Sequence, residues 1–123
     1  MDIRAGLFSL TIVAVVLIAI VLGCGKANPE ACVGTVDYLG KPFEGKGATE
    51  FEAKSNACNT YCRDADPEYQ ARYDLWIDSA KGRNAGSPSK QDAIFKDKEL
   101  MDFVTKTCNR ICITQLKPEA KCK

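Results

Sequence analysis

The chain has 123 residues, with 17 lysine and arginine residues against 16 aspartate and glutamate residues, so it is nearly neutral. It contains no block of basic residues, which argues against a nucleic-acid-binding surface. Histidine is absent, which removes the commonest general base and the commonest metal ligand. Seven cysteines are many for a chain of this length, and their positions carry most of what the sequence predicts.

The chain opens with an uncharged and almost wholly apolar segment. Residues 5–25 are long enough to span a bilayer, which takes about 20 residues. The stretch Val21-Leu22-Gly23-Cys24 at its end resembles the lipobox of a bacterial lipoprotein, which implies that Cys24 becomes the lipidated first residue of the mature chain. Three interpretations stay open: a lipoprotein signal, a retained transmembrane helix and an ordinary cleaved signal peptide.

The first two interpretations attach the protein to a membrane, through residues 7–22 or through lipid on Cys24. The sequence therefore divides into a signal or anchor, residues 1–25, and a folded domain, residues 26–123. Six cysteines lie in that domain, an even number that suits three disulfides: Cys32, Cys58, Cys62, Cys108, Cys112 and Cys122. Disulfides form in oxidising compartments, so we expect the domain in the periplasm, at the cell surface or in an equivalent compartment.

The domain is expected to begin with a helix. Asn28-Pro29-Glu30 combines a capping residue, a proline at the first helical position and an acid in the first turn. That helix is predicted to run to Leu39 and to stop at Gly40. The glycine-rich stretch that follows, residues 41–48, is predicted to be a loop.

Two further helix starts follow. Thr49-Glu50-Phe51-Glu52 fits the capping-box pattern, and the helix that it opens carries Cys58 and Cys62 on one face. Asp66-Pro67-Glu68 is a second combination of cap and proline, and it opens a third helix. The apolar stripe of the third helix is expected to face the core, and its aromatic members are Tyr69, Tyr73 and Trp76.

A loop at residues 82–89 is predicted to lead into a last helix, residues 91–116, which Pro118 ends. Its apolar stripe comprises Ile94, Met101, Val104, Cys108, Ile111 and Cys112, widened by Phe95, Leu100 and Phe103. No strand pattern is apparent. The predicted fold class is therefore all-α: a small disulfide-stapled domain of three or four helices, behind an apolar N-terminal helix, with starts near Pro29, Glu50, Pro67 and Gln91.

Two copies of Cys-x-x-x-Cys, at residues 58–62 and 108–112, each place two sulfurs one turn apart on one helix face. Antiparallel helices would give the pairs Cys58–Cys112 and Cys62–Cys108, and parallel helices the pairs Cys58–Cys108 and Cys62–Cys112. We favour the antiparallel pairs, and the parallel arrangement stays open. The third bond, Cys32–Cys122, follows by elimination.

The twin motif resembles the disulfide-linked helical hairpins of mitochondrial intermembrane-space proteins such as the small Tim chaperones. The resemblance covers the four cysteines and implies the local geometry alone. With the lipobox-like stretch, the short cysteine-rich domain is also similar to small bacterial envelope lipoproteins. Alternatives are weaker: zinc needs reduced thiolates, copper-delivery proteins of this spacing add a histidine, and redox exchange uses Cys-x-x-Cys. We therefore predict no cofactor and no metal site.

The acidic residues interleave with lysine and arginine at helical spacing, which is typical of a solvated helix surface. No catalytic arrangement stands out, so the chain is not expected to be an enzyme. The favoured interpretation is a membrane-anchored structural or interaction protein, an accessory to a larger envelope or membrane complex with a protein partner. The alternative is a module that binds a small ligand or a metal in a groove between helices near Trp76 and Tyr73.

Overall fold

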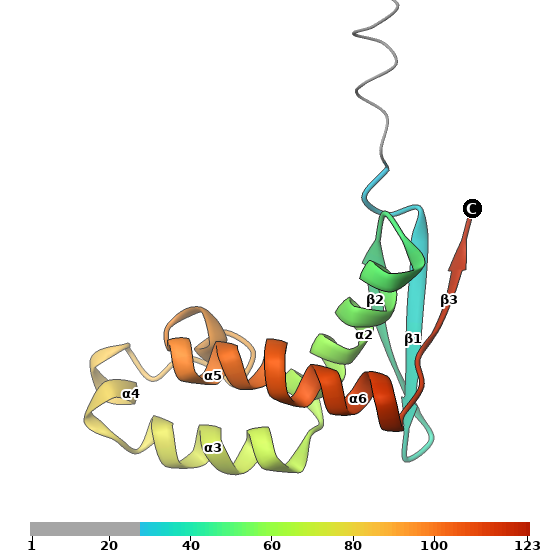
Figure 1. The fold of residues 1–123 in the computed structure, drawn as a ribbon. Helices are drawn as coiled ribbons and strands as arrows, with labels where there is room; N and C mark the ends of the chain where they lie inside the picture. The colour runs from blue at the N-terminus through green and yellow to red at the C-terminus, as the bar shows by residue number, and fades with distance from the viewer. Residues whose placement is uncertain (1–27) are drawn as a thin grey trace, which may run out of the picture.

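The computed structural model describes residues 28–123, and the predicted anchor and Cys24 lie outside the described residues. Three strands and a set of helices make up the described part (Figure 1). The strands are β1 (Cys32–Tyr38), β2 (Lys41–Gly47) and β3 (Glu119–Cys122). The longer helices are α2 (Glu50–Asp64) and α3 (Pro67–Ile77), and α4 (Ala80–Asn84) is a short one. The C-terminal helical segments are η1 (Ala93–Phe95), α5 (Lys98–Asp102), η2 (Phe103–Cys108) and α6 (Asn109–Gln115).

The three strands form one antiparallel sheet in the order β2-β1-β3, so the prediction of an all-α fold is wrong. The domain is α+β. The predicted first helix is strand β1, the predicted loop at 41–48 is strand β2, and the tail is strand β3. None of the helices in residues 28–123 is both long and apolar enough to cross a membrane.

The residues expected to start the first helix form a turn instead. The Glu30 amide donates to Asn28 Oδ1 (3.0 Å), and the Ala31 amide donates to the Asn28 carbonyl (3.1 Å). Asparagine makes such contacts in turns as readily as at helix caps, so the pattern could not distinguish the two. The strand that follows alternates buried and less buried residues, with Cys32, Gly34 and Val36 inward.

Strands β1 and β2 are joined by a two-residue turn, Leu39-Gly40. Both residues are left-handed, with φ of 50° and 79°, the geometry that matches the twist of a hairpin. Leucine rarely adopts this conformation, so the turn lacks the Asn-Gly or Asp-Gly signature by which hairpins are found. Leu39 is 89% exposed, so the turn gains no packing from its side chain.

Helix α2 covers one face of the sheet at very close range. A Cβ atom on Gly34, Gly45 or Gly47 would overlap the backbone of α2, at Ala53 or Ala57. Both alanines are fully buried. We call these five residues the glycine–alanine seam. The helix itself starts as predicted, because the Thr49 side chain accepts from the Glu52 amide (3.2 Å).

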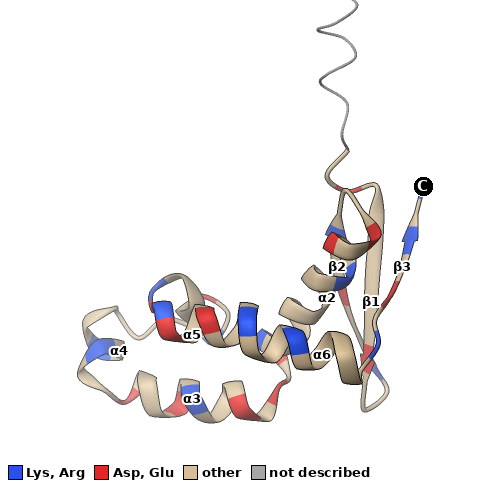
Figure 2. Ribbon diagram, viewed as in Figure 1, with Lys and Arg blue, Asp and Glu red and all other residues tan. Residues whose placement is uncertain are grey.

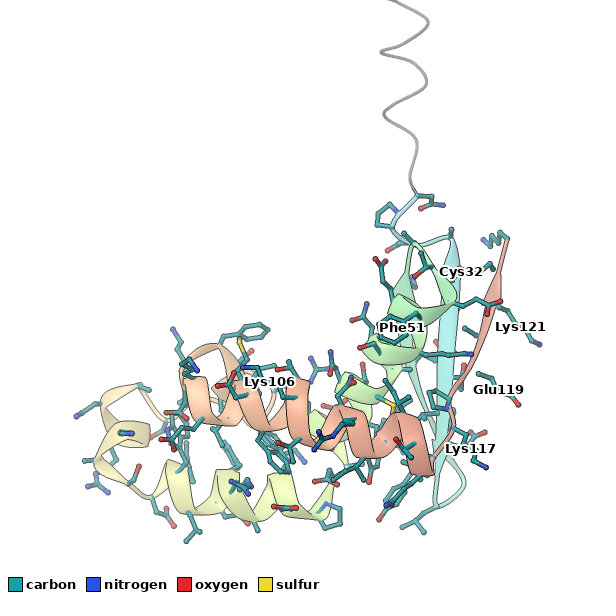
Figure 3. All side chains as sticks on the ribbon, viewed as in Figure 1. Cys32, Phe51, Lys106, Lys117, Glu119 and Lys121 are labelled. Carbon is teal, nitrogen blue, oxygen red and sulfur yellow. A yellow bond between two sulfur atoms is a disulfide. The ribbon has the colours of Figure 1, made fainter. Side chains whose placement is uncertain are left out.

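The other face of the sheet carries polar side chains. Glu119 and Lys121 on β3 lie on the side away from α2 (Figure 3). Their partners across β1 are Thr35 and Val33, which alternate with the inward-facing residues of that strand. An antiparallel sheet with one covered face and one polar face is the usual arrangement.

The remaining helices form an arm that extends from the sheet and α2 (Figure 1). Helix α3 starts as predicted: Asp66 Oδ2 accepts from the Tyr69 amide (2.9 Å), and Pro67 follows the cap. Tyr69 and Trp76 are buried in the core, which confirms the core interpretation of the aromatic stripe. Helix α4 extends into the first residues of the stretch at 82–89 where a loop was expected.

The last predicted helix is interrupted. A 3-10 turn, η1, comes first, and Asp97 then starts a new helix by accepting from the Leu100 amide (3.0 Å). The segment η2 is π-helical, an uncommon widening that apolar periodicity cannot reveal. Most of the predicted stripe is buried, but Phe95 is 67% and Ile111 44% exposed, so these two positions were misassigned.

Charges of both signs are mixed along the arm (Figure 2). Glu68 and Arg72 pair at 2.9 Å along α3. Asp102 accepts from Lys98 at 2.6 Å and lies 3.1 Å from Lys106. These hydrogen bonds, first that from Lys98, lower the pKa of the Asp102 carboxyl. All three pairs have the i,i+4 spacing, as expected for a solvated helix surface with local ion pairs.

Candidate functional site

Two disulfides join α2 to the last helical segments. Cys58 is bonded to Cys112 and Cys62 to Cys108, with Cα–Cα separations of 5.7 and 5.9 Å. All four cysteines are buried. These are the pairs of the antiparallel interpretation, and the parallel alternative is wrong.

The third disulfide joins Cys32 on β1 to Cys122 on β3, with a Cα–Cα separation of 3.9 Å. It links two residues that also face each other in the strand register. All six cysteines of the described chain are therefore paired, and the pairs coincide with those favoured from the sequence. Because the six sulfurs are in disulfides, they offer no thiolate for zinc or copper.

Beside the disulfides, Asn109 fixes α6 against α2. It is the buried polar side chain of the described core, at 7% exposure. Its Nδ2 donates to Asn59 Oδ1 (2.7 Å) and to the Ser55 carbonyl (2.8 Å). A buried amide with both bonds made favours one alignment of the two helices. This role could not be predicted from the sequence, because Asn109 is one of the variable positions between the cysteines of the second motif.

A pocket of about 180 Å³ opens where α2, the start of α3 and α6 meet the hairpin turn. We call it the elbow pocket, and its walls include Tyr38, Tyr61, Asp66, Glu68, Phe103 and Ile111. Cys108 and Cys112 also line it, so the two core disulfides lie behind its wall. This pocket was not found from the sequence, because its walls come from four separate segments.

Aromatic rings form much of the elbow pocket. The rings of Tyr38 and Tyr61 meet edge to face with their centroids 4.9 Å apart. Phe43 supports Tyr61 from behind, at 5.8 Å between centroids. Phe103, which also lines the pocket, stacks on Tyr69 with the ring centroids 6.5 Å apart. The rings therefore support one another, which holds the pocket walls in place.

The polar groups of the elbow pocket are acidic. The Tyr61 hydroxyl donates to Asp66 Oδ1 (3.3 Å), and Glu68 lies at the rim. Burial and, next, the negative charge of Asp66 raise the pKa of the Tyr61 phenol, so it stays neutral. No lysine or arginine is among the residues that line the pocket. Arg72 lies nearby, paired with Glu68, and its guanidinium is 4.3 Å from the Phe103 ring centroid.

The groove expected near Trp76 and Tyr73 is present in part. Trp76 lines a groove of about 260 Å³ between α3 and α5, together with Arg72, Leu75, Asp97, Glu99 and Leu100. Tyr73 is not among the lining residues, and its hydroxyl donates to the Pro88 carbonyl (2.8 Å). Trp76 Nε1 is buried and has no hydrogen-bond partner within residues 28–123. Charges of both signs border this groove, so it favours no ligand charge.

Among residues 28–123, no group of three or more histidine, cysteine, aspartate or glutamate side chains is arranged to hold a metal ion. No family model matches this chain, and no curated protein or solved structure was found to match it. The resemblance to envelope lipoproteins, the absence of catalysis and the membrane anchor therefore stay predictions. What the described residues offer is binding chemistry: an aromatic pocket with carboxylates, and a mixed groove on the arm.

Proposed function

We propose that the protein is a membrane-anchored, non-catalytic interaction protein on the non-cytoplasmic side, an accessory to a larger envelope or membrane complex. The observation that carries the proposal is the pairing of all six described cysteines. Four of them are buried between α2 and the last helices, as part of the core itself. A domain whose core depends on disulfides suits an oxidising compartment.

The place of the N-terminal end of the domain supports a tether. Asn28 precedes β1, and the C-terminus lies beside the same end of the sheet (Figure 1). The arm of α3 to α5 lies at the opposite end of the sheet and extends to its side (Figure 1). An anchor at residues 7–22, or a lipid on Cys24, would then attach at the end of the sheet opposite the one from which the arm extends.

The arm carries apolar side chains that suit a protein partner. Leu75 is 79% exposed beside the groove lined by Trp76 and Leu100. Phe95 is 67% exposed and borders a groove of about 310 Å³, whose apolar lining includes Met101. Exposed apolar residues that adjoin a groove provide the anchors that interfaces use.

Membrane fractionation combined with site-specific photo-crosslinking tests the proposal in cells. A photoreactive residue replaces Leu75 or Phe95, and the control position is Glu44, an exposed residue on the sheet. We expect the protein in the membrane fraction, and the same discrete adduct from both arm positions but not from Glu44. Recovery of an unlipidated chain that starts after Cys24, free of membranes, would contradict the anchor. Equal labelling from all three positions would contradict a specific partner.

The alternative, a small-ligand module, is favoured by one observation, the elbow pocket. Its supported aromatic rings and converging carboxylates are features of ligand sites. A purified chain that binds a small molecule at this pocket and yields no adduct in cells would favour the alternative.

A further inference from the structure

The size and walls of the elbow pocket suit the end of a small organic group. Its volume, about 180 Å³, compares with cavities of about 150 Å³ that accept benzene. Tyr61 and Phe103 are buried and form the interior of the pocket, whereas Ile111 and Glu68 are exposed at its mouth. A group can therefore reach the rings from solvent without a change in the fold.

The charges around the pocket select for a cation. Asp66 and Glu68 both contribute carboxylates, and no cationic side chain is among the lining residues. Glu68 is paired with Arg72, but Asp66 forms no ion pair within the described chain. Asp66 accepts one hydrogen bond from the Tyr61 hydroxyl and one from the Tyr69 amide, and a carboxylate has room for more. The ionised side chains that line the pocket are therefore all negative.

The aromatic walls match an ammonium group in particular. Ring faces attract cations through their quadrupole, most strongly where water is excluded. One ring of the pocket wall already contacts a cation, because the half-exposed Arg72 guanidinium lies 4.3 Å from the centroid of Phe103. The rings of Tyr38 and Tyr61, by contrast, have no cation placed over them within the described residues.

We propose that the elbow pocket binds an alkylammonium group, held between the Asp66 carboxylate and the rings of Tyr38 and Tyr61. The group is the end of a free amine or of a lysine side chain on a partner protein. The inference goes beyond the proposed function, because it requires neither the membrane anchor nor the partner surface of the arm. The Trp76 groove is less suited, because Arg72 and the two acids at its edge give it both signs of charge.

Titration of the full chain in non-ionic detergent, followed by NMR shifts of the tyrosine rings and backbone amides, tests the proposal. The probes are tetramethylammonium, n-butylammonium and the neutral isostere of the latter, butan-1-ol. We expect the two cations to shift signals of Tyr38, Tyr61 and Asp66, with the alcohol binding about tenfold more weakly. The affinity for the cations should fall as salt is added. Equal binding of cation and alcohol would overturn the proposal.

Two helix caps supply a matched pair of variants. Asp66→Asn removes the charge but keeps an acceptor for the Tyr69 amide, since asparagine also caps helices. It should weaken n-butylammonium binding about fivefold. Asp97→Asn makes the same change at the cap of α5, in the other groove, and should leave binding unchanged. Tyr38→Leu should weaken n-butylammonium binding about threefold. If Asp97→Asn weakens binding as much as Asp66→Asn, the cation is not bound in the elbow pocket.

A short peptide with blocked ends and one central lysine distinguishes the two sources. A partner lysine predicts that the peptide binds more tightly than n-butylammonium, because its backbone adds contacts at the pocket mouth. A free amine predicts equal or weaker binding of the peptide. If no cation binds while Leu75 and Phe95 still crosslink to a partner, the ammonium site is wrong and the proposed function stands. If cations bind but the protein neither crosslinks to a partner nor associates with membranes, the ammonium site stands and the proposed function is wrong.

Discussion

The sheet with α2 and the helical arm are held together in different ways. In the first region, the glycine–alanine seam brings the backbone of α2 against the backbones of β1 and β2. In the second, large side chains such as Tyr69, Trp76 and Phe103 fill the space between helices. The two core disulfides and Asn109 connect the regions. A core made of backbone contacts depends on the absence of side chains, and one made of rings depends on their presence.

The largest expected effect comes from adding a side chain to the seam. Gly45→Val would place carbon atoms against the backbone of Asn56 and Ala57, which cannot move aside without shifting α2. Overpacking of this kind costs up to about 3 kcal/mol in tolerant cores, and we expect more than about 4 kcal/mol here. Chemical denaturation of the oxidised protein measures the change.

Gly40→Ala is the control for that variant. Gly40 has a left-handed φ of 79° but no atom within 4 Å of an added Cβ. Alanine there should cost about 1 kcal/mol, from backbone strain alone. If the two variants lose similar amounts of stability, α2 packs less closely on the sheet than the described distances indicate.

The next largest effects come from removing disulfides. The loss of stability should differ between a bond that joins the two regions and one within the sheet. Cys58→Ala with Cys112→Ala opens a loop with a sequence separation of 54 and empties two buried positions. We expect a loss of about 4 kcal/mol. Cys32→Ser with Cys122→Ser should cost only about 2 kcal/mol, because the four-residue strand β3 can detach in the native state and regain part of the freedom.

Hydrogen exchange shows where each loss falls. Without the Cys32–Cys122 bond, exchange should rise in β1 at residues 32–35, which pair with β3, and stay unchanged in α3. Faster exchange throughout the arm would contradict the claim that the two regions are stabilised independently.

Asn109 provides a smaller test of the connection between the regions. Asn109→Leu keeps the size of the side chain but leaves the Ser55 carbonyl and Asn59 Oδ1 without their donor. We expect a loss of about 2 kcal/mol. Thr114→Val is the control on the same helix, because its exposed hydroxyl bonds only to the Arg110 carbonyl of its own helix. A loss in the control as large as that in Asn109→Leu would argue against a special role for the amide.

The same contrast explains what the sequence could reveal. The starts of α2 and α3 were predicted, because Thr49, Asp66 and Pro67 act locally. The aromatic stripe of α3 was predicted because side chains pack there with helical period. The antiparallel disulfide pairs were favoured because two Cys-x-x-x-Cys helices can meet face to face, although the sequence left the parallel pairs open.

The sheet was missed for physical reasons. Gly34, Gly45 and Gly47 are typical of loops, and only the approach of α2 makes them strand residues. The Leu39-Gly40 turn has no common hairpin signature, and β3 is a strand only because β1 and Cys32 hold it. The elbow pocket was missed because its walls gather from four segments.

The smallest expected effect concerns Tyr69 in the arm. Its hydroxyl donates to the Lys90 carbonyl (2.6 Å), so Tyr69→Phe should cost about 1 kcal/mol. Burial raises the pKa of the Tyr69 phenol to about 12. A raised pKa favours the protonated phenol in the folded state. The stability that it contributes is therefore complete below pH ~10 and is lost as the pH rises toward about 12. Denaturation between pH 9 and 11 should show a shallower decline in Tyr69→Phe, and an unchanged slope would contradict this role.

A disulfide map of the protein taken from its native cells tests most directly whether the domain folds with the three described disulfides in an oxidising compartment. Thiols are blocked before lysis, and the non-reduced peptides are then analysed by mass spectrometry. We predict the bonds Cys32–Cys122, Cys58–Cys112 and Cys62–Cys108, each near full occupancy and none shared with Cys24. Blocked free thiols at Cys58 or Cys62 would contradict the oxidising compartment, and a bond from Cys58 to Cys108 would contradict the fold.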